Sequence, residues 1–155
     1  MEGPTRSMPL DELKTRLGSE IGVSGWYTLD QDTITKFADL TDDHFFLHTD
    51  PERAGQTPFG GTIAHGFLTL SMLAGMAYQA MPGVAGAKMG VNYGFNKIRF
   101  MAPVKAGKRV RGHFTPRSIE TQDGGRVQIV HDVSVEIEGE TKPAIIAEWV
   151  SMVWL

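Results

Sequence analysis

Cysteine is absent from this chain of 155 residues. Its absence excludes disulfide bonds and thiolate catalysis, and it suits a cytoplasmic protein, which is the location we predict. Charge of one sign is not concentrated anywhere, because 18 acidic and 15 basic residues are interspersed and the net charge is -3. This balance argues against nucleic acid or an anionic membrane as a partner.

Targeting and membrane signals are also missing. Residues 1–5, Met-Glu-Gly-Pro-Thr, show no basic segment leading into an apolar one, so no signal peptide is predicted. The charge-free segment 63–80 is long enough to suggest a membrane helix, but it contains His65, Gln79 and two glycines. We therefore predict a helix buried in the core of a water-soluble protein and no membrane span.

The hydrophobic content of 41% is enough for one domain with a core, which we assign to residues 1–155. Apolar residues at helical spacing predict a helix at 9–17 and a second one that begins at an Asp30 or Asp32 cap and stops near Asp42. Residues 43–61 are rich in Asp, Pro and Gly and are interpreted as a long functional loop. The segment 64–80 is predicted to form the one long helix.

The second half of the chain has the pattern of a half-buried sheet. Its predicted strands are 91–100, 109–119, 127–137 and 144–153, with a shorter candidate at 25–29. Turn signals at 123–125 and 138–140 favour antiparallel hairpins. We predict an α+β fold in which an antiparallel sheet of about five strands wraps one hydrophobic helix. The exposed edges of such a sheet favour a homodimer.

Two short motifs carry residues suited to chemistry. The first is Asp42-Asp43-His44-Phe45-Phe46-Leu47-His48, and the second is Ala64-His65-Gly66 at the head of the apolar helix. On a regular helix, Asp43 and His48 would point about 140° apart, so they converge only if the preceding helix has ended. Burial beside Phe45 and its neighbours is expected to make the carboxylate a better proton acceptor.

Gly66 lies in the first turn of the predicted central helix, where backbone N–H groups lack partners within the helix. Such an N–H group, together with the helix dipole, stabilises a developing oxyanion, and glycine allows a substrate to approach closely. A carboxylate, an imidazole and an oxyanion-binding group are what hydration of a double bond conjugated to a carbonyl requires.

These motifs resemble the MaoC-like dehydratase family, the hot-dog-fold (R)-specific enoyl-CoA hydratases, and in particular its single-domain branch related to nodulation protein N. The family pattern Gly-Asp-x-Asn-Pro-(Ile/Leu)-His matches residues 42–48 and places the catalytic pair on Asp43 and His48. The pattern Ala-His-Gly-(Met/Leu/Phe)-Leu matches residues 64–68, and the segment 92–104 also resembles this branch. The resemblance extends over most of the chain.

Three positions depart from the family pattern. Phe45 and Phe46 replace the usual Asn-Pro. Asp42 replaces the usual glycine and is expected to place a second carboxylate near the site. Ala74 stands where some relatives carry a serine, which argues against a direct role for a helix hydroxyl.

The resemblance implies reversible hydration of trans-2-enoyl-CoA to (R)-3-hydroxyacyl-CoA by a homodimer. Asp43 and His48 would activate and position the water, and the Gly66 N–H group would bind the thioester oxygen. Coenzyme A enters only as part of the acyl-CoA substrate, and neither a further cofactor nor a metal is implied. The predicted substrate-binding residues are Phe45, His65, Tyr93 and Asn96.

Alternatives remain open at this stage. His65 also suits a structural role in fixing the loop before the helix, and Tyr93 and Asn96 either line the pocket or satisfy the backbone. A metal site built from the Asp43–His48 segment and His65 is disfavoured because the spacing matches no common zinc pattern. The competing functions are an acyl-CoA thioesterase of the same fold and a non-catalytic module that binds acyl thioesters.

Overall fold

The computed structural model describes residues 3–155. Its main feature is a six-stranded antiparallel sheet with the order β2-β6-β7-β8-β5, to which β3 is added by pairing with β6. The strands are β2 (Gly22–Val23), β3 (Tyr27–Thr28), β5 (Met89–Phe100), β6 (Arg109–Gln122), β7 (Arg126–Ile137) and β8 (Ile145–Trp154). The predicted antiparallel sheet is confirmed. The single domain over residues 1–155 remains a prediction, and its first two residues lie outside the described part of the chain.

The hairpin turns form where glycine provides them. Gly124 and Gly125, between β6 and β7, have φ values of 74° and 73°, and Gly139, between β7 and β8, has φ 77°. These values lie in the left-handed region, which glycine adopts without a steric cost. A small parallel pairing of β1 (Ser7–Met8) with β4 (Gly83–Val84) was not predicted, because neither segment shows strand periodicity.

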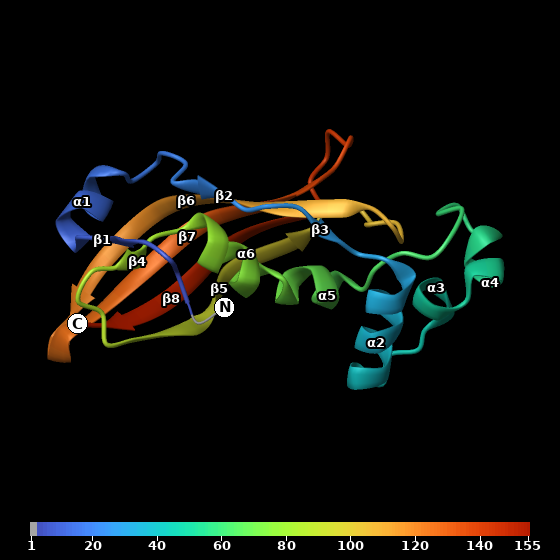
Figure 1. Ribbon diagram of the computed structural model, residues 1–155, viewed down its shortest axis with the longest axis horizontal. Coiled ribbons are helices and arrows are strands. Elements are labelled where there is room, and N and C mark those ends of the chain that lie inside the picture. The colour runs from blue at the N-terminus through green and yellow to red at the C-terminus, as the bar shows by residue number, and fades with distance from the viewer. Residues whose placement is uncertain (1–2) are drawn as a thin grey trace.

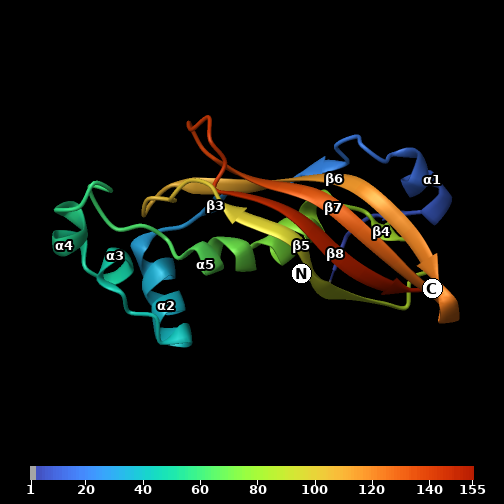
Figure 2. The same cartoon turned by 180° about the vertical axis from the view of Figure 1, so that it is seen from behind.

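The central helix consists of α5 (Gly66–Ser71) and α6 (Leu73–Ala80). It begins later than predicted, because His65 has an extended ψ of 136°, and it is interrupted at Met72. Met72 keeps a φ of -70° and a ψ of -16°, and its N–H group still bonds to the Leu68 carbonyl oxygen at 3.2 Å. The two helices therefore run on as a nearly continuous rod beneath the curved sheet (Figures 1 and 2).

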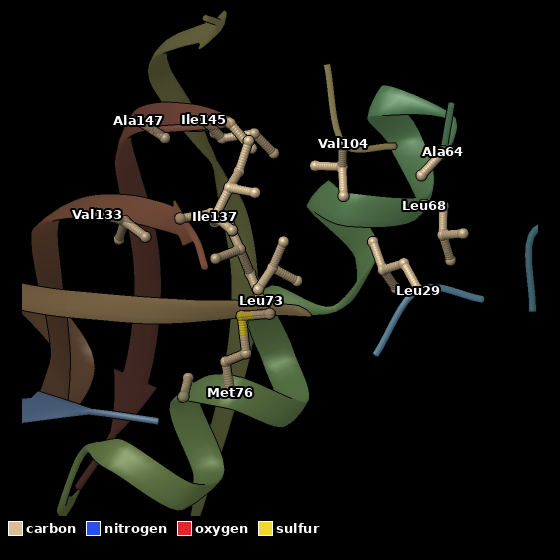
Figure 3. Packing of buried hydrophobic residues seen from close by; sticks show 14 of the residues in the cluster. Leu29, Ala64, Leu68, Leu73, Met76, Val104, Val133, Ile137, Ile145 and Ala147 are labelled. Carbon is tan, nitrogen blue, oxygen red and sulfur yellow. The ribbon is translucent and has the colours of Figure 1, made fainter. Parts of the chain in front are cut away.

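The main core lies between this rod and the inner face of the sheet. Leu73 and Met76 of α6 are fully buried and lie close to Ile137 of β7 in Figure 3. On the α5 side, Leu68 and Leu29 pack beside Val104. Within residues 3–155, no helix has the length and apolar character needed to cross a membrane.

The other helices are α1 (Leu10–Thr15), α2 (Gln31–Thr41), α3 (Phe46–Thr49) and α4 (Pro51–Gly55). Asp30 is the cap of α2, since its carboxylate accepts a hydrogen bond from the Thr33 N–H group at 2.8 Å. The loop predicted at 43–61 is wrong in part, because it contains α3 and α4. Asp50 caps α4 and Pro51 begins it, so the residues interpreted as loop formers start a helix.

Candidate active site

The predicted pair of Asp43 and His48 converges at one end of the molecule, where α2, α3 and α4 gather beside the start of α5 (Figure 1). The helix α2 ends at Thr41, and Asp42 reverses the chain with a left-handed φ of 59°. Asp43 and His48 then meet His65, and one ionisable atom of each of the three lies within 4.8 Å of the others. The end of α2 before Asp43, which the convergence of Asp43 and His48 requires, is therefore present.

His48 is held by backbone groups of a neighbouring segment. Its Nδ1 atom lies 2.7 Å from the carbonyl oxygen of Ile63, and the Ile63 N–H group donates to the Leu47 carbonyl at 3.0 Å. Gln31 also donates from Nε2 to the His48 carbonyl oxygen at 2.7 Å. Because a carbonyl only accepts, Nδ1 carries the proton, and the Nε2 atom of neutral His48 is left free to accept one.

His65 is buried, with 2% of its surface exposed, and it fixes the position of Asp43. Its Nε2–H group donates to the Asp43 carbonyl oxygen at 3.0 Å, while its buried Nδ1 atom has no hydrogen-bond partner within residues 3–155. Burial lowers the pKa of His65, and the nearby His48 lowers it further. His65 is thus a neutral residue that joins Asp43 to the start of α5, which supports the structural role considered above.

The three side chains have a spacing that a metal ion requires, but the orientation of the rings is unfavourable. The His48 and His65 rings are stacked, with centroids 3.8 Å apart and an interplanar angle of 24°. Imidazole lone pairs lie in the ring plane, so two nearly parallel rings do not direct them at one ion. The arrangement suits hydrogen bonding and proton transfer better than metal coordination.

A cavity of about 460 Å³ opens at this cluster. It runs past Gly66, the first residue of α5, toward the residues that follow β5 and the start of β8. Its walls include Asp43, His48, Phe59, Ile63, His65, Gly66, Phe67, Thr69, Phe100, Val104 and Ile145. The cavity lining combines a carboxylate and two imidazoles with a largely apolar surface, the composition of a small-molecule site.

Gly66 is required by the close approach of Phe100. A β-carbon at position 66 would lie 2.8 Å from the Cδ1 and Cε1 atoms of the Phe100 ring. The Gly66 N–H group stands at the first position of α5, where it has no partner within the helix. Gly66 lines the cavity next to Asp43 and His48, and its oxyanion-binding role remains a prediction.

Several predicted site residues lie elsewhere. Phe45 is 54% exposed and packs on Phe46, with ring centroids 4.7 Å apart, and it is not part of the cavity wall. Tyr93 and Asn96 are exposed on the edge strand β5 and do not line the cavity either. The position of a residue along a predicted strand does not reveal whether it lines a cavity, because that depends on which other segments pack beside the strand.

Two expectations about carboxylates are wrong. Asp43 is exposed, so the burial expected beside Phe45 is not found. Asp42 does not place a second carboxylate in the site, since its side chain is fully exposed and lies 3.7 Å from His44. The wall residues Phe59, Thr69 and Phe100 were missed, because no local pattern marks a cavity formed by segments distant in sequence.

A larger groove of about 700 Å³ lies on the solvent face of the sheet. Its charged side chains compensate one another, as in the 2.7 Å contact of His113 with Glu136 and the 3.0 Å contact of Arg117 with Asp132. We assign no chemistry to this groove, because paired surface charges are a common feature of exposed sheet faces.

The model of the MaoC like domain family matches residues 12–138. The chain belongs to the MaoC-like family. This MaoC-like protein is 47% identical over 147 residues to nodulation protein N from Rhizobium leguminosarum bv. viciae, a match that covers 94% of this chain and 91% of the relative. It is 46% identical over 137 residues to 3-hydroxyacyl-thioester dehydratase Z from Mycobacterium tuberculosis, covering 88% and 90% of the two chains.

A solved structure agrees with the fold. The X-ray structure of a monoamine oxidase regulatory protein from Archaeoglobus fulgidus superposes with a TM-score of 0.78 at 24% identity, and the match covers 97% of each chain. The predicted α+β hot-dog fold, an antiparallel sheet around a central helix, is confirmed. The predicted membership of the MaoC-like family is confirmed as well.

Proposed function

We propose that this MaoC-like protein is a hydro-lyase that hydrates trans-2-enoyl-CoA reversibly to (R)-3-hydroxyacyl-CoA. One observation carries the proposal: the Asp43 carboxylate and the His48 ring, whose Nδ1 atom is engaged by Ile63, meet at a cavity that contains the start of α5. The relative named 3-hydroxyacyl-thioester dehydratase Z supports a thioester substrate and this reaction type.

In the proposed reaction, Asp43, His48 and Gly66 have separate roles. A water molecule held between Asp43 and His48 attacks C3 of the enoyl group, and one of its protons passes to this pair. The electrons of the double bond shift toward the thioester oxygen, where the Gly66 N–H group stabilises the negative charge. A proton then adds to C2, so that the elements of one water have been added across the bond. No step requires a metal or a redox cofactor.

The apolar part of the cavity accommodates the acyl chain. Phe59, Phe67 and Phe100 contribute aromatic surface to its wall, and Ile145 contributes aliphatic surface. The volume of about 460 Å³ falls in the range of small-molecule sites, so a short or medium chain is the expected substrate. The coenzyme A portion remains outside as part of the substrate.

We further propose that the protein acts as a homodimer through the edge strand β5. This strand pairs with β8 on one side only, and Val91 and Tyr93 on it are 42% and 68% exposed. Long unpaired edges that carry exposed apolar side chains favour pairing with a second chain.

The first experiment follows loss of the enoyl-thioester absorbance with crotonyl-CoA and with a medium-chain trans-2-enoyl-CoA, and it determines the configuration of the product. Loss of absorbance with formation of the (R)-3-hydroxy product is the expected result. Release of free coenzyme A from a saturated acyl-CoA would instead indicate a thioesterase. Tight binding without turnover at every chain length would indicate a binding module, and either result would overturn the proposal.

A further inference from the structure

A second cavity of about 520 Å³ lies at the other end of the central helix from the candidate active site. It is bounded by the end of α6, by β4, by the start of β5 and by the inner sides of β7 and β8. Its apolar wall includes Met81, Val84, Val91, Ile129, Trp149 and Val153. No residue lines both cavities, so an occupant of this one would not contact Asp43 or His48.

A buried histidine lines this cavity. His131 of β7 is 6% exposed, stands opposite Trp149 of β8 in the sheet register, and forms no side-chain hydrogen bond within residues 3–155. Burial lowers the pKa of His131 to about 4, so the ring is neutral at pH 7 and offers one donor and one acceptor. The His131 ring nitrogens are not among the sealed, unpartnered atoms, so water reaches them and a polar group on a bound molecule would take its place.

The charged residues among the described lining of the cavity are cations. Arg6 and Lys88 are the charged residues among its described lining residues, and no carboxylate lines it. Arg6 donates from Nη2 to the Ala80 carbonyl oxygen at 2.9 Å, and Lys88 donates from Nζ to a main-chain oxygen of Leu155, the last residue of the sequence, at 3.1 Å. The bond to Ala80 holds Arg6 at the cavity without neutralising its charge, so an anionic group on a ligand is favoured beside Arg6.

We propose that this cavity binds a hydroxylated fatty-acid anion. Its carboxylate meets Arg6 and Lys88, its hydroxyl group bonds to His131, and its alkyl chain packs on the apolar wall beside Trp149. Each part of the ligand has a counterpart in the cavity lining: the two cations for the carboxylate, the His131 imidazole for the hydroxyl group and the apolar surface for the alkyl chain. The site is separate from the candidate active site and does not depend on the function proposed there.

Trp149 provides the signal for a direct test. The chain has three tryptophans, and replacing Trp26 and Trp154 with phenylalanine leaves Trp149 as the only indole. The probes are 3-hydroxydecanoate, decanoate and decanol, each titrated into the full-length protein below its micelle concentration. We expect saturable fluorescence changes in the affinity order 3-hydroxydecanoate, decanoate, decanol, because the last two each lack one polar group.

Variants separate the two polar contacts. His131→Phe is expected to abolish the preference for 3-hydroxydecanoate over decanoate, which a single hydrogen bond sets at roughly three- to tenfold. His131→Gln retains a donor and an acceptor and should keep that preference. Arg6→Gln with Lys88→Gln changes exposed residues, leaves the fold intact, and should remove the preference for decanoate over decanol.

Asp43→Asn is the control for the other cavity and should leave the Trp149 titration unchanged. Equal affinity for 3-hydroxydecanoate and decanoate in the parent protein would overturn the proposal, as would a preference that survives His131→Phe. Absence of any saturable change would also overturn it, and in a dimer this result would indicate that a second copy of the chain covers the cavity.

Discussion

At the scale of single residues, backbone carbonyl groups determine which nitrogen atoms of the two site histidines are free. The Nδ1–H group of His48 donates a hydrogen bond to the Ile63 carbonyl oxygen, and the Nε2–H group of His65 donates one to the Asp43 carbonyl oxygen. The first bond leaves His48 ready to accept a proton beside the Asp43 carboxylate, and the second uses His65 for structure. The two histidines are therefore not equivalent, although both lie at the cavity.

The roles of Asp43 and His48 are tested by amide substitutions. Asp43→Asn and His48→Gln should each lower the rate of enoyl-thioester hydration by about 10²- to 10⁴-fold, because each removes a group that handles a proton. The measurement is steady-state hydration together with a thermal melt. The melting temperature of Asp43→Asn should change little because Asp43 is exposed, whereas His48→Gln also loses the Nδ1 contact with Ile63 and is compared at a temperature well below its own melt.

Neighbouring residues provide matched controls for these variants. Asp42→Asn changes a fully exposed carboxylate at a left-handed position that asparagine tolerates, and His44→Gln changes a surface imidazole 2.9 Å from Asp39. Both controls should retain most of the activity. Equal losses in controls and test variants would show that the motif acts through folding rather than through proton transfer.

The buried His131 predicts a pH dependence of stability. Its folded pKa of about 4 lies below the ordinary histidine pKa of 6.5, so the unfolded chain binds a proton more readily than the native chain. Stability is therefore full above pH 6.5 and falls as the pH drops toward 4, by about 3 kcal/mol from this residue. Urea unfolding at pH 7, 5.5 and 4.5 measures this loss.

A variant that does not titrate tests whether His131 causes this loss of stability at low pH. His131→Gln should flatten the decrease in unfolding free energy between pH 6.5 and 4, while His65, whose pKa is lowered in the same direction, leaves a smaller residual decrease. If the parent and the variant lose the same stability over this range, the buried imidazole is not the cause.

At the scale of elements, close backbone contacts decide how the central helix meets the sheet. Gly22 of β2 stands against the end of α6, and a β-carbon there would lie 2.0 Å from the Ala80 carbonyl oxygen. A clash with backbone atoms cannot be relieved by a change of rotamer, so glycine at position 22 is what allows β2 to pack against α6.

Gly22→Ala should therefore lower the free energy of unfolding by about 2–4 kcal/mol. Gly55→Ala in α4 is the matched control, because no atom lies within 4 Å of the added β-carbon. That control should be neutral or stabilising by up to about 1 kcal/mol. Chemical denaturation of both variants checks this, and a Gly22→Ala protein as stable as the parent would contradict the packing of β2 on α6.

At the scale of the whole molecule, the two edges of the sheet differ. The β5 edge is a strand of 12 residues with exposed Met89, Val91, Tyr93 and Phe100, whereas the opposite edge consists of the two-residue strands β2 and β3. A long apolar edge is the better surface for pairing with a second copy.

Light scattering after gel filtration should thus give a dimer for the parent protein. Val91→Lys combined with Tyr93→Lys should shift it to a monomer, because buried ammonium groups at a paired edge are unfavourable. Val23→Lys on the opposite edge is the control and should remain a dimer. A monomeric parent, or an equal effect of the control, would show that β5 is not the interface.

Much of the fold could be predicted from local patterns. The strand predicted at 127–137 matches β7 almost to the residue, Asp30 was one of two caps proposed for α2, and the glycines at 124 and 139 marked the hairpins. The short helices α3 and α4 were missed, because their Asp and Pro residues favour loops and helix starts equally.

The sequence by itself determined the strand pattern, the helix caps and the two motifs that carry Asp43, His48 and Gly66. Each of these depends on residues within one or two turns of one another. Only the tertiary structure decided that Ile63 binds His48, that Phe100 covers Gly66, and that His131 lines a separate cavity. Such contacts join segments far apart in the chain, and they exist only once the sheet has closed around the helix.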